Sequence, residues 1–410
     1  MQIILFETRQ PQLEPITLTQ PAFSVRCGSF CLRSLLPACV PHSGIHAIVP
    51  KHLQGVAQQL CPKPKRWETK LLFIDGSLQP DTRFFGKIAT LVEHGKSFQV
   101  TVGKMIVVAF VDTQRLQLRH GAAQRLSSET VQGFLAGLKL PKAKVAAVRF
   151  EHLWDVLTAH PSLLAAQLPL RAVGLQKLKV NVFVGKQVQI HPSAVLDTTG
   201  GLIVLHNRTQ VAAYAVLRGP LYIGRDCKIN SFAEIKNSGI GDFCKIGGEV
   251  EDSIIQSYGN KQHYGTIAHS YVGSWVNLGA GTTNSDLKST YGEVKMHGQP
   301  TGQQFLGCVV GSFSKTSIGT LLYTGKVVGA NCNVLGAVTR DVPSFTNAGS
   351  LVKTPVEFPL DAAQRMQAAM MARRQCPVTG AHRRLLQDVY ALTIAERKAA
   401  GIKKGKLELR

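Results

Sequence analysis

The chain has 410 residues, of which 44% are hydrophobic, so it can bury the cores of more than one domain. It lacks a run of ~20 apolar residues for a membrane span and a signal peptide, and its nine cysteines form no C-x-x-C pair, which predicts a reduced, cytoplasmic protein without a zinc site. The formal charge of +22 favours an anionic partner, and 7% aromatic residues without a recognised binding module argue against nucleic acid.

Residues 1–150 show the pattern of a mixed α/β domain. Short apolar runs bounded by turn residues predict strands, and the stretch SSETVQGFLAGL predicts a helix that begins near Ser128, where a serine cap precedes an acidic residue. The predicted strands are residues 3–6, 45–49, 71–74, 98–102, 106–111 and 145–150.

Residues 151–177 predict a connector. Its stretch LWDVLTAHPSLLAAQLPL, at 153–170, is typical of a helix that is interrupted near Pro161. The apolar residues of this helix suit packing between two domains.

Residues 178–350 contain a repeat. Apolar residues recur about every six positions and are often followed by glycine, as in Ile223-Gly224 and Ile240-Gly241. Such a period predicts a parallel β-helix, in which each six-residue unit forms one short strand and one corner and three units close a coil. We therefore expect an α/β domain followed by a left-handed parallel β-helix of hexapeptide repeats.

The repeat is irregular at residues 250–266 and 284–306, which carry polar groups and extra residues. We expect loops there, because binding chemistry is usually carried by loops that leave a rigid scaffold. After Pro343 the repeat ends, and residues 351–410 form a basic tail with predicted helices at 361–374 and 381–399.

Arg218 and Lys236 lie 18 residues apart, which is one predicted coil, so their side chains should stack on one face of the β-helix. Two stacked cations suit a phosphate clamp, since arginine can bind two oxygens at once. A solvated basic face is the alternative.

Residues 241–292 carry long and unusual motifs: GGEVE, H-x-G, AHSYVGSWVNLGAG and NSDLK-x-TYG. With LEPITLTQP near the start, WD in the connector and VLRGPLYIG at the entry to the repeat, they resemble the bacterial family of sugar nucleotidyltransferases. That family is a diverged relative of the bifunctional N-acetylglucosamine-1-phosphate uridyltransferase/glucosamine-1-phosphate N-acetyltransferase. The resemblance implies a nucleotidyltransferase-like amino-terminal domain and a homotrimeric acyltransferase domain. It also implies acetyl transfer from acetyl-coenzyme A to a phosphorylated amino sugar such as glucosamine 1-phosphate, followed by coupling to UTP with Mg²⁺.

The resemblance implies His263 as the catalytic base, because this histidine precedes Gly273 by ten residues within the first irregular stretch. An imidazole titrates near working pH and can take a proton from the sugar ammonium. His269, in AHSYVG, is the alternative base, or a residue that braces a neighbouring subunit or the base. Asn277 resembles a position that contacts the sugar during catalysis.

Further positions are implied to bind the substrates. Arg218 and Lys236 resemble sugar-phosphate-binding residues, and the second irregular stretch, which closes over the sugar in the relative, carries Asn284, Tyr291 and Lys295. The predicted coenzyme A contacts are Gly279, Ala280 and Ser312, and Arg383 and Arg384 of the tail either meet its phosphates or belong to a solvated helix.

The amino-terminal domain departs from the family pattern of active enzymes. The strand IILFE runs into TRQPQLEP without the glycine-rich loop that wraps nucleotide phosphates, Ala22 stands where lysine is expected, and Arg26 and Gly28 keep the R-x-G step. Either the domain has lost nucleotidyl transfer, or it binds nucleotide through Arg26, Gly28 and the lysines at 63 and 65. Asp75, at the end of a strand, is the one candidate metal ligand, although aspartates before glycine are common in turns.

Three functions remain open at this point. The first is acyl transfer to a sugar 1-phosphate on the β-helix. The second is UTP-dependent nucleotidyl transfer by the amino-terminal domain, with the β-helix as a trimerisation scaffold. The third is non-catalytic assembly.

Overall fold

The computed structural model describes residues 1–64, 66–117 and 122–410, so Lys65 of the predicted nucleotide-binding set lies outside the described residues. The chain divides into two compact units. The amino-terminal unit comprises residues 1–13, 20–25 and 30–151, and the carboxyl-terminal unit comprises 14–19, 26–29 and 152–410. Two short segments from the start of the chain thus belong to the second unit, which the linear boundary at residue 150 does not anticipate.

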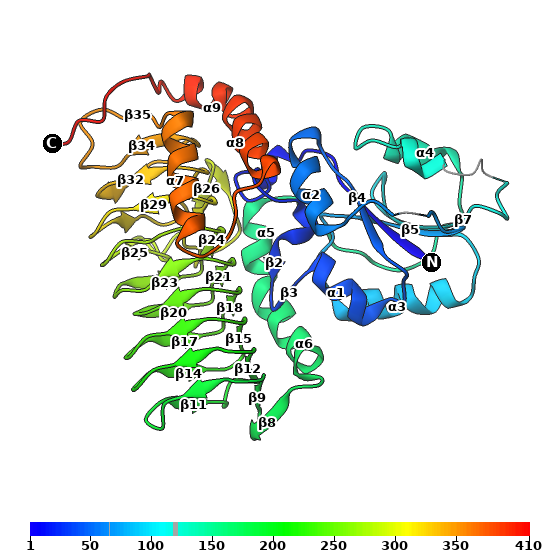
Figure 1. The fold of residues 1–410 in the computed structure, drawn as a ribbon, viewed down its shortest axis with the longest axis horizontal. Coiled ribbons are helices and arrows are strands. Elements are labelled where there is room, and N and C mark those ends of the chain that lie inside the picture. The colour runs from blue at the N-terminus through cyan, green and yellow to red at the C-terminus, as the bar shows by residue number, and fades with distance from the viewer. Residues whose placement is uncertain (65, 118–121) are drawn as a thin grey trace. The chain divides into compact units, whose positions relative to one another are not determined.

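The amino-terminal unit is built on a five-stranded sheet in the order β4-β1-β5-β7-β6 (Figure 1). Strand β1 is parallel to β4 and β5, whereas β7 is antiparallel to β5 and β6. The apolar runs of β1 and β5 are buried on both faces, as expected for central strands. The strands of this unit are β1 (Gln2–Phe6), β3 (Phe30–Cys31), β4 (Ile45–Ile48), β5 (Lys70–Asp75), β6 (Phe98–Val102) and β7 (Met105–Asp112).

Five of the six predicted strands are confirmed, but the strand predicted at 145–150 is wrong. That segment is extended and makes one isolated bridge, between Leu78 and Arg149. Its backbone bonds go to the turn after β5, where Phe150 N donates to Ser77 O and Gln79 N donates to Val148 O. The helix expected near Ser128 begins at α4, and the helices of the unit are α1 (Leu32–Cys39), α2 (Gln54–Leu60), α3 (Thr82–Glu93) and α4 (Val131–Gly137).

The connector forms two helices, α5 (Leu153–Thr158) and α6 (His160–Ala172), in the carboxyl-terminal unit. The predicted break is confirmed: Pro161 occupies the first turn of α6, where its missing N–H leaves no helical bond unmade. Leu164 and Leu168 of α6 pack against Val204 and Tyr222 of the β-helix.

The β-helix follows, with three faces of stacked strands (Figure 1) that are parallel except for the first strand of the first face and the last strand of the second face, which pair antiparallel with their neighbours. The first face consists of β8 (Gln176–Lys179), β9 (Val182–Val184), β12 (Ile203–Leu205), β15 (Leu221–Ile223), β18 (Gly239–Ile240), β21 (Ile254–Ile255), β24 (Tyr271–Val272), β28 (Val309–Val310) and β31 (Val327–Val328). The second face consists of β10 (Gln189–Ile190), β13 (Gln210–Val211), β16 (Lys228–Ile229), β19 (Lys245–Ile246), β22 (Asn260–Lys261), β29 (Lys315–Thr316), β32 (Asn333–Val334), β34 (Thr346–Ala348) and β35 (Val356–Glu357). The third face consists of β11 (Val195–Asp197), β14 (Val216–Arg218), β17 (Glu234–Lys236), β20 (Glu249–Glu251), β23 (Thr266–Ala268), β25 (Thr283–Asn284), β30 (Leu321–Leu322) and β33 (Ala337–Val338).

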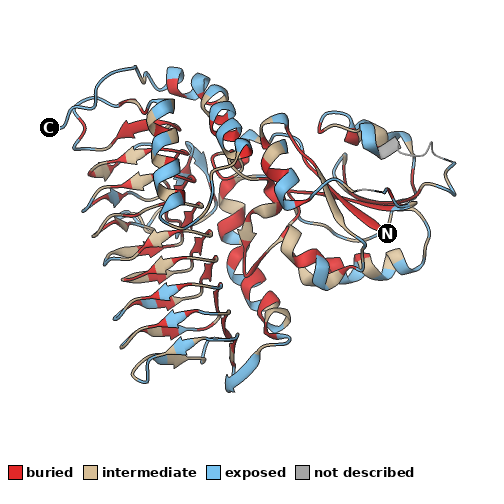
Figure 2. Cartoon of the chain, viewed as in Figure 1, coloured by how far each residue is buried: buried red, intermediate tan, exposed pale blue. Residues whose placement is uncertain are grey.

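The interior of the β-helix is a column of buried aliphatic side chains and cysteines, which Figure 2 shows as buried positions recurring from coil to coil. Most strands point one apolar side chain inward, so the six-residue period follows from the geometry of the coil. The predicted fold class is confirmed.

One of the two predicted loops is wrong. Residues 250–266 form regular strands, and the pattern is hidden because Lys261 stands at an inward position. Its ammonium donates to Gly247 O at 2.6 Å, Gly265 O at 2.6 Å and His263 O at 3.1 Å, which satisfies the buried charge. The second predicted loop is confirmed as an insertion between β25 and β28, with a hairpin of β26 (Lys295–Met296) and β27 (Gln299–Pro300).

The tail forms α7 (Leu360–Ala372), α8 (Gly380–Leu392) and α9 (Ile394–Ala399), close to the predicted helices. Strand β2 (Arg26–Cys27) also belongs to the carboxyl-terminal unit. Among the described residues, every helix is too short or too polar to span a bilayer.

Candidate active site on the β-helix

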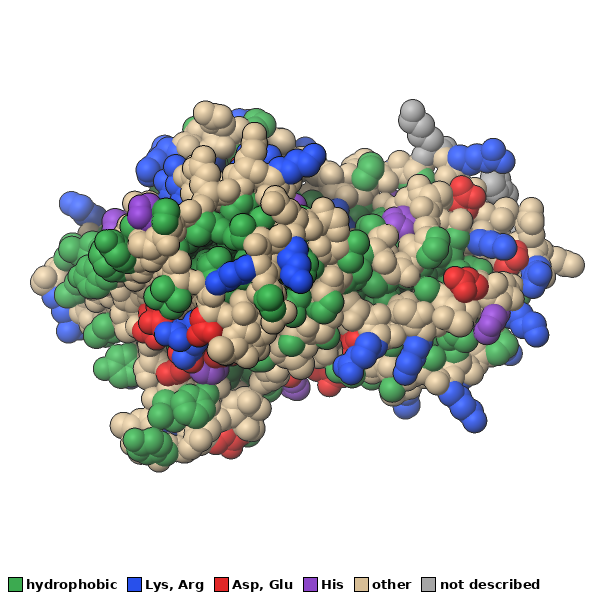
Figure 3. Space-filling view, turned by 90° about the horizontal axis from the view of Figure 1, so that it is seen from below, with side chains coloured by type: hydrophobic (Ala, Val, Ile, Leu, Met, Phe, Trp, Pro, Cys, Tyr) green, Lys and Arg blue, Asp and Glu red, His purple; other side chains and the backbone are tan. Residues whose placement is uncertain are grey.

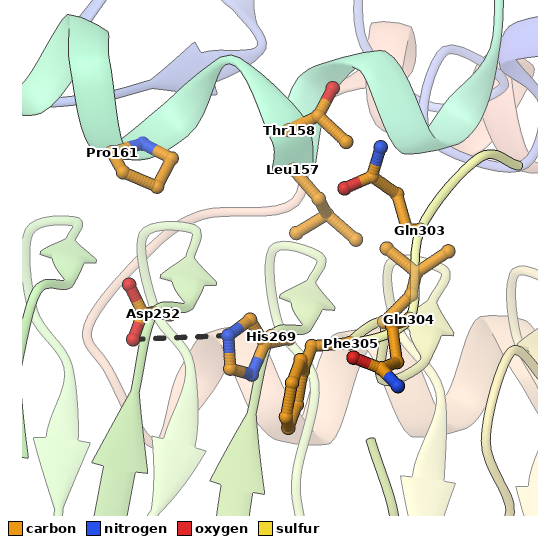
Figure 4. Close-up of a pocket in the computed structure, with 9 residues that line it drawn as sticks. Leu157, Thr158, Pro161, Asp252, His269, Gln303, Gln304 and Phe305 are labelled. Atoms are coloured by element: carbon orange, nitrogen blue, oxygen red, sulfur yellow. Dashed lines mark ion pairs between the residues drawn. The ribbon is translucent and has the colours of Figure 1, made fainter. Parts of the chain in front are cut away.

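A cavity of about 350 Å³ opens at the corner between the third and first faces of the β-helix (Figure 4). Helices α5 and α6 contribute apolar and hydroxyl groups to it, and the insertion contributes its last residues. The lining residues are Leu157, Thr158, Pro161, Asp252, His269, Gln303, Gln304, Phe305 and Leu306. The cavity therefore combines an apolar wall with one imidazole and one carboxylate.

His269 is held on both sides by acidic groups. Its Nδ1 lies 2.8 Å from Asp286 Oδ2, and its Nε2 lies 3.9 Å from Asp252 Oδ2, the ion pair drawn in Figure 4. Burial lowers the pKa of His269, but the hydrogen bond to Asp286 and the charges of Asp252 and Asp286 outweigh it, so this pKa is raised. A carboxylate on Nδ1 leaves Nε2 as the nitrogen that exchanges protons with the cavity.

The register of the coils brings these groups together. Glu251 and Ala268 are partners in the third face, so the residues that follow them, Asp252 and His269, occupy the same corner of successive coils. Both have positive φ, at 44° and 46°. Asp286 comes from the start of the insertion, and its hydrogen bond to His269 lowers its own pKa.

His263 lies elsewhere. It is exposed at the corner between the second and third faces, whereas His269 follows β23 at the opposite edge of the third face. The structure therefore does not bring His263 into the cavity, and its assignment as the base stays a prediction.

Arg218 and Lys236 are stacked partners, as their spacing predicts. Both are already paired with carboxylates: Arg218 lies 3.1 Å from Asp197 and 3.1 Å from Glu234, and Lys236 lies 2.6 Å from Glu251. The third face is thus charge-matched, and a phosphate bound there has to compete with these carboxylates.

Two predicted asparagines have structural partners. Asn284 is buried; its Oδ1 accepts from Ala268 N at 2.7 Å and its Nδ2 donates to Ala268 O at 3.0 Å. This brace between coils engages the Asn284 amide on both ends, and a contact of Asn284 with substrate stays a prediction. Asn277 lies on the second face and bonds to Asn260. Tyr291 and Lys295 are exposed on the insertion, where a role in binding remains a prediction.

The predicted coenzyme A positions pack against the next coil. A side chain at Gly279 would meet Ser317 C at 2.5 Å, and Ala280 O accepts from Gly319 N at 2.8 Å. Ser312 is 3% exposed, and its backbone N lies where a Cβ at Gly273 would come within 2.6 Å. These small residues allow close stacking of coils, and their contacts with coenzyme A stay predictions.

Arg26 and Gly28 also have packing contacts, and their role in nucleotide binding stays a prediction. Gly28 N donates to Nδ1 of the buried His160 at 2.9 Å, so this N–H is not free for a phosphate. The Arg26 guanidinium lies 5.2 Å from the centre of the Tyr222 ring. Burial lowers the pKa of His160 to about 4, which keeps its Nδ1 an acceptor.

Comparisons with known proteins agree with this architecture. Residues 3–174 match the family model described as sugar nucleotidyl transferase. Bifunctional GlmU of Nostoc sp. is 28% identical over 174 residues, which cover 42% of this chain and 31% of that protein. Bifunctional GlmU of Synechococcus sp. CC9311 is 31% identical over 127 residues, which cover 30% and 25%. Over this part of its length, the chain is a diverged relative of GlmU.

This chain spans about a third of the length of the GlmU proteins that it matches. Among solved structures, a UDP-N-acetylglucosamine acyltransferase of Francisella novicida aligns with a TM-score of 0.26 at 13% identity, over 52% of this chain and 78% of that one. PerB of Caulobacter crescentus, solved with CoA and GDP-perosamine, aligns with a TM-score of 0.17 at 18% identity, over 40% and 55%.

Asp75 is the predicted ligand for the Mg²⁺ that nucleotidyl transfer of the GlmU type would require. Asp75 is buried, and its Oδ1 accepts from Ser77 N at 2.8 Å and Ser77 Oγ at 2.7 Å. Glu7 is nearby, but burial raises its pKa to about 8. Within the described ranges no three acidic, histidine or cysteine side chains gather as metal ligands. These residues do not fit a Mg²⁺ site, because one carboxyl is protonated near neutral pH and the other is engaged by Ser77.

Proposed function

We propose that the chain is an acyltransferase that transfers acetyl from acetyl-coenzyme A to the amino group of a phosphorylated sugar such as glucosamine 1-phosphate. The observation that carries this proposal is His269, an imidazole oriented by Asp286 within a cavity of about 350 Å³. The relationship to GlmU supports the choice of substrates.

The surroundings of His269 suit an amine acceptor. An amino sugar arrives as an ammonium ion, which the carboxylates of Asp252, Asp286 and Glu251 attract. Neutral His269 removes the proton through Nε2, and the amine then attacks the thioester carbonyl. A C–N bond forms, the C–S bond breaks, and the imidazolium gives its proton to the departing thiolate; the freed imidazole then takes the second proton of the attacking nitrogen, which leaves a neutral amide.

The phosphate of the acceptor is assigned to the third face beside this cavity. Lys236 is the last residue of β17 and lies directly before the corner that carries the cavity. Its partner on the next strand is Glu251, which is followed in the chain by Asp252 of the cavity lining. Arg218 lies one coil away. A phosphate that displaces Glu251 from Lys236 would gain two neighbouring cations.

A homotrimer is part of the proposal. Four exposed apolar side chains follow the corner between the second and third faces: Tyr214 (59%), Phe232 (73%), Tyr264 (73%) and Ile318 (76%). The rings of Tyr214 and Phe232 stack at 5.3 Å. Exposed hydrophobic side chains are visible among charged ones in Figure 3. We assign this apolar ridge to contacts with further copies of the chain, which would also place His263 at a subunit boundary.

The test is release of free thiol from acetyl-coenzyme A in the presence of glucosamine 1-phosphate. We expect His269→Ala to lower kcat/KM by about 100-fold or more, the usual contribution of a general base. Asp286→Asn should lower the pH at which the rate is half-maximal, because the carboxylate that raises the His269 pKa is lost.

His263→Ala is the matched control. If it abolishes turnover while His269→Ala does not, His263 is the base and the assignment of His269 is wrong. No thiol release with any amino-sugar phosphate contradicts the proposed acceptor. Pyrophosphate release from UTP and N-acetylglucosamine 1-phosphate, with Mg²⁺ present, would instead support nucleotidyl transfer.

A further inference from the structure

Four cations gather where the tail meets the second face of the β-helix. Lys228 and Lys245 are direct partners in adjacent strands, β16 and β19. Arg373 and Arg374 follow α7, and their charges act on Lys245. We call Lys228, Lys245, Arg373 and Arg374 the tail cluster.

An aromatic stack fixes the tail at this place. Cys376 Sγ lies 3.6 Å from the hydroxyl of Tyr258, at the corner between the first and second faces. The ring of Tyr258 is stacked between Phe243, at 4.9 Å, and Trp275, at 4.1 Å. Phe243 is two residues before Lys245, so the anchored turn holds Arg373 and Arg374 beside the lysines.

The tail cluster differs from the paired cations of the neighbouring coils in having no acidic partner among the described residues. Arg208 pairs with Asp226, Arg218 with Asp197 and Glu234, Arg225 with Asp242, and Lys236 with Glu251. Over residues 1–64, 66–117 and 122–410, no carboxylate lies within ion-pair distance of any tail-cluster side chain. The ion pairs of the neighbouring coils balance the charges of Arg208, Arg218, Arg225 and Lys236, whereas the charges of the tail cluster are not balanced by nearby carboxylates among the described residues.

Like charges opposite each other in a sheet are destabilising. Burial, followed by the charges of Arg374, Lys228 and Arg373, lowers the pKa of Lys245. The folded chain therefore holds these cations together against their repulsion, and an anion with several charges would relieve it.

We propose that the tail cluster binds a ligand that carries adjacent phosphate groups. Two arginines can each hold two phosphate oxygens, and the lysines add point charges from the rigid ladder. A di- or triphosphate carries several negative charges that it can share among the four cations. This site is separate from the His269 cavity, and its binding does not depend on the proposed acyl transfer.

The experiment is calorimetric titration of the full chain with tripolyphosphate. We expect binding to the native chain and about tenfold or greater weakening in Lys228→Gln/Lys245→Gln and in Arg373→Gln/Arg374→Gln, since each pair removes charge-assisted contacts. Lys87→Gln/Lys96→Gln in the amino-terminal unit removes the same charge and should leave binding unchanged. Thermal unfolding provides a second readout, because tripolyphosphate should raise the Tm of the native chain and not that of the two cluster variants.

Competition identifies the natural source of the phosphates. Displacement of tripolyphosphate by coenzyme A assigns the site to the acyl donor, and displacement by UTP alone assigns it to a nucleoside triphosphate; both support the site. The proposal is wrong if tripolyphosphate does not bind, or if the cluster variants bind it as tightly as the lysine control does.

Discussion

Glu7 shows how one buried residue sets the response of the fold to pH. Its Oε2 accepts from Ala22 N at 2.8 Å in a fully buried place, and burial raises its pKa from 4.5 to about 8. Gly76 is required beside it, because a Cβ there would lie 2.6 Å from the same oxygen. The carboxyl is therefore neutral in the folded chain at a pH where it would be ionised in the unfolded chain.

We predict that the free energy of unfolding of the amino-terminal unit falls as pH rises from about 4.5 to about 8. The group's pKa is raised on folding, so its contribution is complete below the unfolded pKa and is lost as pH rises through the folded pKa. Glu7→Gln keeps an acceptor for Ala22 and should remove this slope, a difference of roughly 3–5 kcal/mol at pH 8. Denaturant unfolding at several pH values measures it.

The exposed Glu93→Gln is the control for Glu7, and it should leave the slope unchanged. An unaltered slope in Glu7→Gln would show that another group controls it.

At the scale of elements, the insertion between β25 and β28 is attached to the coils by two histidine–aspartate pairs. His269 of a coil meets Asp286 at the start of the insertion, and His297 of the hairpin meets Asp341 of a later coil at 3.1 Å. Because the last residues of the insertion line the His269 cavity, the hairpin pair helps to hold that wall in place.

We predict that the hairpin loosens as pH rises. The hydrogen bond to Asp341 raises the pKa of His297 despite burial. The pair therefore stabilises the hairpin fully below the pKa of His297 in the unfolded chain, and this stabilisation is lost as pH rises through the pKa in the folded chain. His297→Gln should speed hydrogen exchange at residues 294–303 by about fivefold below pH 6, as expected for a pair worth about 1 kcal/mol. Mass spectrometry of exchange measures this.

The inner strands β12 and β15 serve as the internal reference for His297→Gln, and their exchange should not change. Equal exchange of the hairpin in both proteins would mean that the pair does not hold it.

At the scale of the whole molecule, the apolar ridge of Tyr214, Phe232, Tyr264 and Ile318 is the feature that an isolated chain leaves unexplained. Soluble chains rarely expose several large apolar side chains along one edge unless another surface covers them.

We predict that Phe232→Ser/Ile318→Ser converts a trimer into monomers, because both side chains are more than 70% exposed and serine removes their apolar surface. Light scattering measures the molar mass. Leu60→Ser, which alters a partly exposed residue of the other unit, should leave the mass unchanged. A native chain that is monomeric at high concentration would contradict the proposed trimer.

The sequence by itself determined the β-helix, the broken connector helix and five of the strands of the amino-terminal sheet. Local chemistry carries these features: one apolar side chain per six residues must face the interior, and Pro161 must start a new helical turn. It also determined that Arg218 and Lys236 stack, since a fixed coil length converts spacing into register.

Only the tertiary structure decided what those residues contact. The carboxylates beside Arg218 and Lys236 and the Gly247 carbonyl beside Lys261 come from neighbouring coils, and the Asp286 partner of His269 comes from the insertion. Such contacts depend on small changes in coil length and on where the insertion returns. A buried polar side chain with all its hydrogen bonds made looks in sequence like a loop residue, which is why Lys261 hides a regular coil.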